Sequence, residues 1–209
     1  MNHSKAGGNL KLRNLNIGAG ADLIVEDYLN IDYSYTPEFI ERYRTSTNVG
    51  VLRMDIVNEF RGIQNVDVVY TCHLLEHVTL VEGRDFLTHC YSSLNIGGKL
   101  RLCVPDFNIW ATALSNNDTE FFDFYRSNMP YKIDNVYNNN FAFFTTVIYG
   151  HGHRMIYTFD FLQDLLKDIG FRNIEQRVWG ESNIPQISTL EDKNNILRSK
   201  ESLIIEAIK

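Results

Sequence analysis

The chain has 209 residues, 44 % of them hydrophobic and 22 % charged, and a formal net charge of −6 at pH 7. This balance is that of one globular domain over residues 1–209, and it excludes disordered, collagenous and coiled-coil proteins. No apolar run approaches the roughly 18 residues of a membrane span, and the first residues hold no apolar stretch of a secretory signal. Lys and Arg are scattered, so we expect neither a membrane nor a nucleic acid as partner.

Three widely spaced cysteines, Cys72, Cys90 and Cys103, lie in apolar surroundings. Their odd number and spacing are typical of reduced thiols rather than of a disulfide framework. We therefore expect a cytoplasmic protein.

Strand and helix patterns alternate through the first half of the chain. The predicted strands cover residues 15–17, 28–32, 51–55, 66–72 and 100–105. A helix over 36–44 starts with Thr36 as cap and Pro37 in the first turn, and a second over 80–94 ends in a left-handed glycine cap within 95–98. Such alternation predicts an open, mostly parallel α/β sheet.

The second half contributes a helix over 159–169, ended by Gly170, and two strands over 174–179 and 203–208, which predict a hairpin at one edge. Residues 115–157, between the fifth strand and the helix over 159–169, do not follow the alternation of strands and helices. Ten of the chain's 26 aromatic residues lie between Phe121 and Tyr149. We expect a helical or irregular insertion, whose rings either pack it against the body or line an acceptor pocket.

Residues with binding chemistry follow the predicted strands at their carboxyl ends, where open α/β sheets bind ligands. Gly18 and Gly20 follow the first strand and permit close backbone approach. Asp32 ends the second strand and suits a ribose diol. Asp55 ends the third and suits an adenine amino group, with Ile56 beside it to pack on the ring.

In this order the chain resembles the class I S-adenosylmethionine (SAM)-dependent methyltransferases. The matching segments are LNIGAG (15–20), YLNID (28–32), LRMDI (52–56), VDVVYTCHLLEHV (66–78), LNIGGKLRLCVPD (94–106), FRNIEQRV (171–178) and SLIIEAIK (202–209). The resemblance implies a Rossmann-like class I methyltransferase fold: a mostly parallel seven-stranded sheet with an antiparallel last strand and an aromatic-rich insertion after strand five. Within the family, the chain is similar to small bacterial proteins that accompany sugar and surface-polysaccharide genes.

The resemblance implies SAM as cofactor. The implied cofactor-binding residues are Asn16, Gly18, Ala19, Gly20, Asp32, Tyr33, Asp55, Ile56, Cys72 and His73. The glycines would approach the methionine moiety, Asp32 the ribose and Asp55 the adenine, while His73 would border both cofactor and acceptor. Asn16 stands where the family usually has an acid, and only eleven residues separate Gly20 from Asp32, too few for a full helix.

Residues 73–77 also match H-x-x-E-H, the inverted zinc-peptidase motif, so a zinc hydrolase is one alternative. A second is a metal-dependent O-methyltransferase using His73, Glu76 and His77, since some small-RNA 2′-O-methyltransferases carry a similar E-x-x-E-H segment. Our first expectation is no metal, with Glu76 capping the turn and His77 packing.

Two further histidines, His151 and His153, are flanked by glycines after the insertion, as expected of a loop that faces an acceptor. Histidine takes protons near neutral pH, so the candidate catalytic bases are His151, His153, His77 and His73. The predicted function is methyl transfer to a small-molecule acceptor, with a hydroxyl of a sugar or sugar-like metabolite as the expected group. A cofactor-binding pseudoenzyme is the remaining alternative. The insertion either mediates a homodimer or covers the site, and both readings stay open.

Overall fold

The computed structural model describes residues 12–46, 48–129 and 139–209. Residues 1–9, whose sequence predicts a loose polar tail, lie outside the described residues. The described strands form one seven-stranded sheet of order β3-β2-β1-β4-β5-β7-β6. Their bounds are β1 Asn14–Ile17, β2 Tyr28–Asp32, β3 Gly50–Arg53, β4 Val66–Cys72, β5 Leu94–Pro105, β6 Arg172–Arg177 and β7 Ser202–Ile208. The first five are parallel, and β7 is antiparallel to both β5 and β6. This confirms the predicted fold class.

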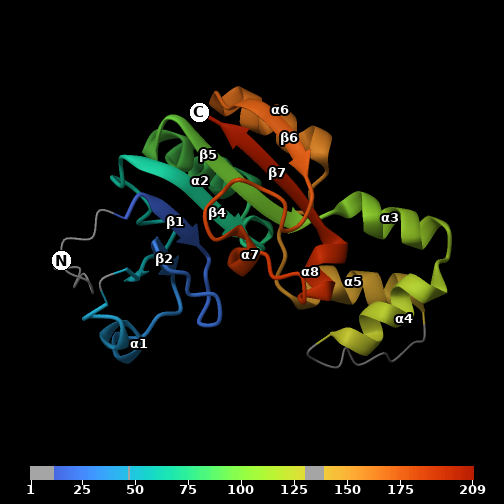
Figure 1. Cartoon of the computed structure of the whole chain (residues 1–209). Helices are drawn as coiled ribbons and strands as arrows, with labels where there is room; N and C mark the ends of the chain where they lie inside the picture. The colour runs from blue at the N-terminus through green and yellow to red at the C-terminus, as the bar shows by residue number, and fades with distance from the viewer. Residues whose placement is uncertain (1–11, 47, 130–138) are drawn as a thin grey trace.

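Two amphipathic helices cover one face of the sheet, α2 (Leu80–Ser93) and α6 (Phe159–Ile169) (Figure 1). A capping box between Thr79 and Glu82 starts α2, and Gly170, with φ of 118°, ends α6 in the predicted left-handed cap. In the main core, leucines and phenylalanines at helical spacing pack against apolar side chains of the central strands.

The opposite face is covered by irregular chain and the short helix α7 (Ile187–Leu190). No helix connects β1 to β2, as the short spacing predicted. Instead the loop 18–27 is held by two buried amides. Asn16 Nδ2 donates to the carbonyl of Leu23 at 2.8 Å and to Asn30 Oδ1 at 3.0 Å, and the same Asn30 oxygen accepts from Val25 N at 3.0 Å.

A buried ion pair holds the irregular segment around Glu191 against the same face of the sheet. The Arg101 guanidinium on β5 donates two 2.6 Å hydrogen bonds to the carboxylate of Glu191 and one of 2.7 Å to Glu206. Both Arg101 and Glu191 are almost fully buried. The bidentate geometry satisfies both charges, and it fixes the chain that leads into α8 (Ile196–Glu201).

Three helices form a separate layer beyond the ends of β5 and β7: α3 (Phe107–Ser115), α4 (Thr119–Asn128) and α5 (Asn140–Gly150) (Figure 1). Their own core contains Trp110, Phe122 and Phe143. The described part of the predicted insertion is thus helical, and it starts at Phe107 rather than near residue 115. A remaining short helix, α1 (Pro37–Arg42), begins at the predicted Thr36 cap.

Three local expectations were wrong. No glycine caps α2, because Leu94 is extended and the chain passes directly into β5; Gly97 (φ 81°) sits instead in a bulge of that strand against β4. The strand predicted over 51–55 ends at Arg53, because Asp55 accepts hydrogen bonds that start a turn. The run of asparagines at 138–140 predicts a loop by its composition, but Asn139 caps α5 and Asn140 is the first residue of that helix.

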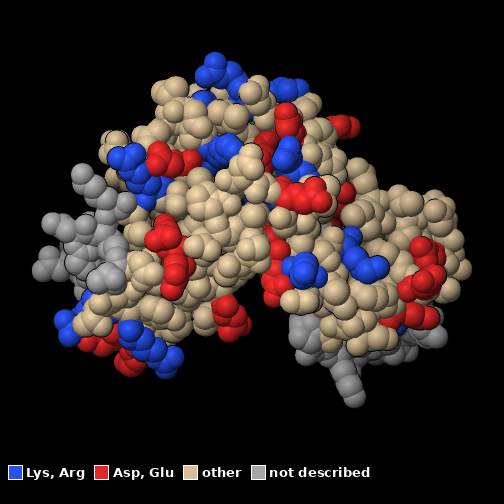
Figure 2. Space-filling view, in the orientation of Figure 1, with Lys and Arg blue, Asp and Glu red and all other residues tan. Residues whose placement is uncertain are grey.

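Within the described residues, no helix is both long and apolar enough to cross a membrane. Figure 2 shows acidic and basic side chains mixed over the visible face, without a continuous basic stripe.

Candidate functional site

The turn after β1 lies at the carboxyl edge of the sheet. Gly18 and Gly20 both have positive φ, 75° and 60°. A Cβ on Gly18 would lie 3.0 Å from the Leu74 side chain, whereas a Cβ on Gly20 would meet no atom within 4 Å. Gly18 is therefore required by packing, and Gly20 leaves open space beside the backbone, as a ligand needs.

Asp32 lies against this turn. Its Oδ2 accepts from Gly20 N at 2.8 Å, and its Oδ1 accepts from the backbone and hydroxyl of Ser34 at 2.8 and 2.6 Å. Each carboxylate oxygen has two acceptor positions, so Oδ2 keeps one for a ligand hydroxyl. The Tyr33 ring beside it is 64 % exposed, with the Arg53 guanidinium 5.1 Å from its centre.

Two residues of the implied cofactor set support the chain around the edge rather than face it. Asn16 is 1 % exposed, and its amide group donates its hydrogen bonds to Leu23 and Asn30, away from the ligand edge. Ile56 is 9 % exposed and packs in the main core. Ala19, in the turn itself, is also buried.

Asp55 starts a turn after β3. Its Oδ2 accepts from Asn58 Nδ2 at 2.8 Å and its Oδ1 from Val57 N at 2.9 Å, and these bonds lower the pKa of the Asp55 carboxyl. The residue is half-buried, so part of its surface is open to solvent. It remains ionised at neutral pH and able to accept a further bond.

The end of β4 joins the two halves of the site. His73 has a positive φ of 50°, and its Nε2 lies 2.8 Å from Ser202 Oγ. Burial lowers the pKa of His73, but the Glu76 carboxylate outweighs burial and raises it overall. A hydrogen bond with the Cys103 thiol lowers the pKa of the neighbouring Cys72 to about 6.

A cavity of about 470 Å³ lies between this strand end and the helical layer. Its lining contains all four candidate bases, His73, His77, His151 and His153. The sequence predicted these four histidines as candidates without placing them in space, and the structure places all four at one cavity.

Glu76 lies at the wall of the cavity in the 3-10 turn η1 (Leu75–His77). Its side chain is 1 % exposed, and neither carboxylate oxygen has a hydrogen-bond donor in bonding geometry. Burial raises the pKa of Glu76, but His73, whose Nδ1 lies 3.3 Å from Oε1, outweighs burial and lowers the pKa overall. The turn thus holds a buried negative charge.

The loop after α5 docks on this turn. The backbone N–H groups of Arg154 and Met155 donate to the Glu76 carbonyl at 2.7 and 3.2 Å. This places the His153 ring 4.9 Å from that of His77. Burial lowers the pKa of His151, and it lowers the pKa of His153 to about 4. Both imidazoles are therefore neutral at pH 7 and able to accept a proton.

Sequence reasoning missed the contribution of α8. Asn195, Arg198 and Glu201 line the cavity, and burial raises the pKa of Glu201. The topology supplies a signal for them, because an antiparallel last strand starts at the edge where the parallel strands end. The residues just before β7 must therefore lie at the ligand edge.

No family model matches the sequence, and no curated protein matches it. Solved structures match over nearly the whole chain. A SAM-dependent methyltransferase from Archaeoglobus fulgidus shares 15 % identity with a TM-score of 0.54, and the match covers 96 % of this chain and 87 % of that chain. For a SAM-dependent methyltransferase from Mesorhizobium loti the values are 14 %, 0.53, 98 % and 92 %.

Phosphoethanolamine N-methyltransferase 2 of Haemonchus contortus, solved with phosphomonomethylethanolamine and S-adenosylhomocysteine, matches at 12 % identity and a TM-score of 0.57. The match covers 95 % of this chain and 49 % of that one, so the chain spans about half the length of that enzyme. At these identities the likeness shows the architecture. The chain has the Rossmann-like fold of the SAM-dependent methyltransferases.

Proposed function

We propose that the protein transfers a methyl group from SAM to a hydroxyl of a small acceptor, a sugar or sugar-like metabolite, in the cytoplasm. One observation carries the proposal. The Gly20–Asp32 contact and the histidine-lined cavity lie at the carboxyl edge of one sheet, and His73 stands at the strand end between them. Donor and acceptor would meet there.

The donor half fits the nucleoside of SAM. The free acceptor position of Asp32 suits a ribose hydroxyl, and the open space at Gly20 suits the methionine moiety. Asp55 is ionised and half-buried, so it can accept from an adenine amino group. His73, which follows β4, lines the cavity on the acceptor side.

The acceptor half fits a small polar molecule. The volume of the cavity, about 470 Å³, lies within the roughly 300–1,000 Å³ that is typical of small-molecule sites. Asn195, Arg198 and Glu201 offer hydrogen bonds of both polarities to a compound with several hydroxyls.

The reaction needs alignment and a base. The acceptor oxygen forms a bond to the methyl carbon as the S–C bond breaks, and the sulfonium becomes a neutral thioether. The hydroxyl proton passes to a neutral imidazole, and the lowered pKa values of His151 and His153 keep both residues neutral at pH 7.

The test is calorimetric titration with S-adenosylhomocysteine, followed by a methylation screen that starts with nucleotide sugars. We expect micromolar binding and methyl transfer to a hydroxyl. Absence of binding overturns the proposal. Binding without transfer to any acceptor in a broad panel replaces it with a cofactor-binding pseudoenzyme.

A further inference from the structure

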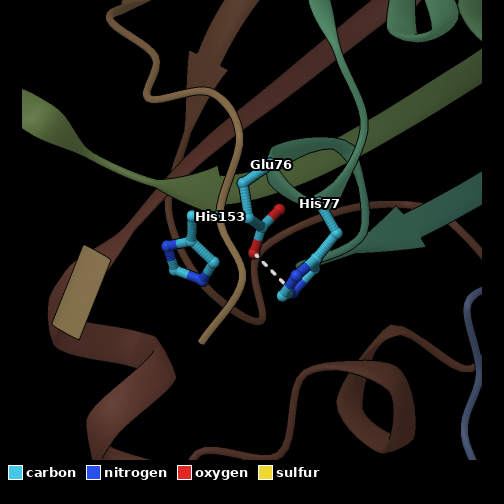
Figure 3. Close-up of side chains that lie close together, drawn as sticks. All are labelled: Glu76, His77 and His153. Atoms are coloured by element: carbon cyan, nitrogen blue, oxygen red, sulfur yellow. Dashed lines mark ion pairs between the residues drawn. The ribbon is translucent and has the colours of Figure 1, made fainter. Parts of the chain in front are cut away.

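Three side chains at the cavity wall converge on one point: Glu76, His77 and His153. One ligand atom from each lies within 4.8 Å of the other two. Figure 3 shows the Glu76 carboxylate between the two imidazole rings. Glu76 and His77 come from the turn after β4, and His153 comes from the loop whose backbone is bonded to the Glu76 carbonyl. The convergence therefore depends on a backbone contact across 77 residues of chain.

The atoms that converge lack the partners that buried polar atoms normally have. Both carboxylate oxygens of Glu76 and Nδ1 of His153 are buried without a hydrogen bond. An unsatisfied buried carboxylate destabilises a fold by several kcal/mol in general. The neighbouring histidines satisfy the carboxylate only in part, since His73 Nδ1 lies 3.3 Å and His77 Nε2 4.0 Å from the same oxygen, Oε1, and neither makes a hydrogen bond to it. A cation at this point would satisfy these atoms together.

We propose that Glu76, His77 and His153 bind one divalent transition-metal ion, with Zn²⁺ as the reference case. Two imidazoles and one carboxylate form a three-ligand set that leaves a position open. Imidazole suits Zn²⁺ and similar first-row ions, whereas Mg²⁺ and Ca²⁺ prefer oxygen ligands. The ligand set differs from the His73, Glu76 and His77 set expected from the sequence, because the atoms that all lie within 4.8 Å of one another belong to Glu76, His77 and His153.

The geometry requires only small adjustments. Ligands at about 2.0–2.2 Å from one cation lie roughly 3–4 Å apart. The largest separation here is at most 4.8 Å, so rotations of the two imidazoles close the site. His77 and His153 are each partly exposed and free to make such rotations.

The open position faces the cavity, since all three ligands line it. Resting on the proposed function, we assign this position to the acceptor oxygen. A hydroxyl bound to a divalent cation has a lowered pKa, so it loses its proton more readily to a neutral base. With His153 as a ligand, His151 is the base.

The test uses the full chain, stripped with chelator and desalted, and titrated with Co²⁺ followed by visible absorption, with Zn²⁺ as competitor. We expect one equivalent of Co²⁺ bound and displaced by Zn²⁺. Glu76→Gln and His153→Ala should each weaken binding by about tenfold or more, the loss that follows removal of even an outer partner of a metal site. His89→Ala, a histidine on α2 outside the cavity, should bind as the wild type does.

Absence of a bound equivalent in the wild type overturns the site, as does equal affinity in His153→Ala. Circular dichroism establishes that each variant is folded; if Glu76→Gln does not fold, the wild type and His153→Ala decide. Calorimetry with S-adenosylhomocysteine on the same samples separates the two proposals. Cofactor binding without metal binding removes the metal site alone, and metal binding without cofactor binding removes the proposed function alone.

Discussion

Asn16 on β1 and Asn30 on β2 share a buried side-chain hydrogen bond of 3.0 Å between neighbouring parallel strands. Through it the amides reach the loop that carries Gly18 and Gly20 and bind its backbone at Leu23 and Val25. The pair takes the place of the helix that usually connects the first two strands of such a sheet. The donor side of the site is thus held by side-chain amides.

Replacing Asn30 by alanine should lower the free energy of unfolding by about 2–4 kcal/mol, because it leaves Val25 N and the carbonyls of Val25 and Gly50 without a buried partner. Urea denaturation measures the loss. Asn14→Ala is the matched control, since Asn14 makes one 3.4 Å bond near the surface and should change stability by about 0.5 kcal/mol or less. Equal losses in the two variants would show that the buried amides do not hold the loop.

Replacing Asp32 by alanine should weaken S-adenosylhomocysteine binding about tenfold or more, because it removes charge-assisted hydrogen bonds to the ribose. Calorimetry gives the affinity. Ser34→Ala is the control, because it removes one donor to Asp32 and keeps the carboxylate and its Gly20 contact. An Asp32→Ala variant with unchanged affinity would exclude the ribose assignment.

Replacing His151 by alanine should lower turnover by about 100-fold, the lower end of general-base contributions, and leave cofactor affinity unchanged. His151 lines the acceptor cavity and not the Gly20 turn. The measurement is kcat with an acceptor identified in the screen, together with calorimetry of cofactor binding. A variant as active as the wild type would exclude His151 as the base.

The metal-free protein should lose stability between pH 7 and pH 5 through His153. Burial lowers the pKa of this group from 6.5 to about 4, so the unfolded chain binds more protons in this interval. Since the ring is partly exposed, the contribution is on the order of 1 kcal/mol at pH 5. Urea denaturation at both pH values should show a smaller loss for His153→Ala than for the wild type. His89→Ala should retain the full loss.

Local chemistry made the fold readable. Strand β4 is rich in β-branched and apolar residues, and α6 combines an apolar stripe with the Gly170 cap, so each element follows from its own residues. The position of Gly20 and Asp32 followed in the same way, because both stand at strand ends, and the structure brings them into contact there.

Contacts between residues far apart in the chain could not be predicted from the sequence. The contact between His153 and His77 depends on backbone bonds from Arg154 and Met155 to Glu76, which no local pattern indicates. The glycines after α2 were misread for a related reason. Their role is set by the strand against which Leu94–Gly98 pairs and not by the helix before them.

The helical layer leaves the sheet and returns to it at one place. Phe107 N donates to the Tyr157 carbonyl at 3.0 Å, and Asp106 is bridged to Tyr157, so the two ends of this fifty-residue excursion are joined. The junction is independent of what lies between its ends. Segments that start and end at one fixed place tolerate replacement, so the helical layer can change in length or sequence while the sheet on either side of it keeps its register.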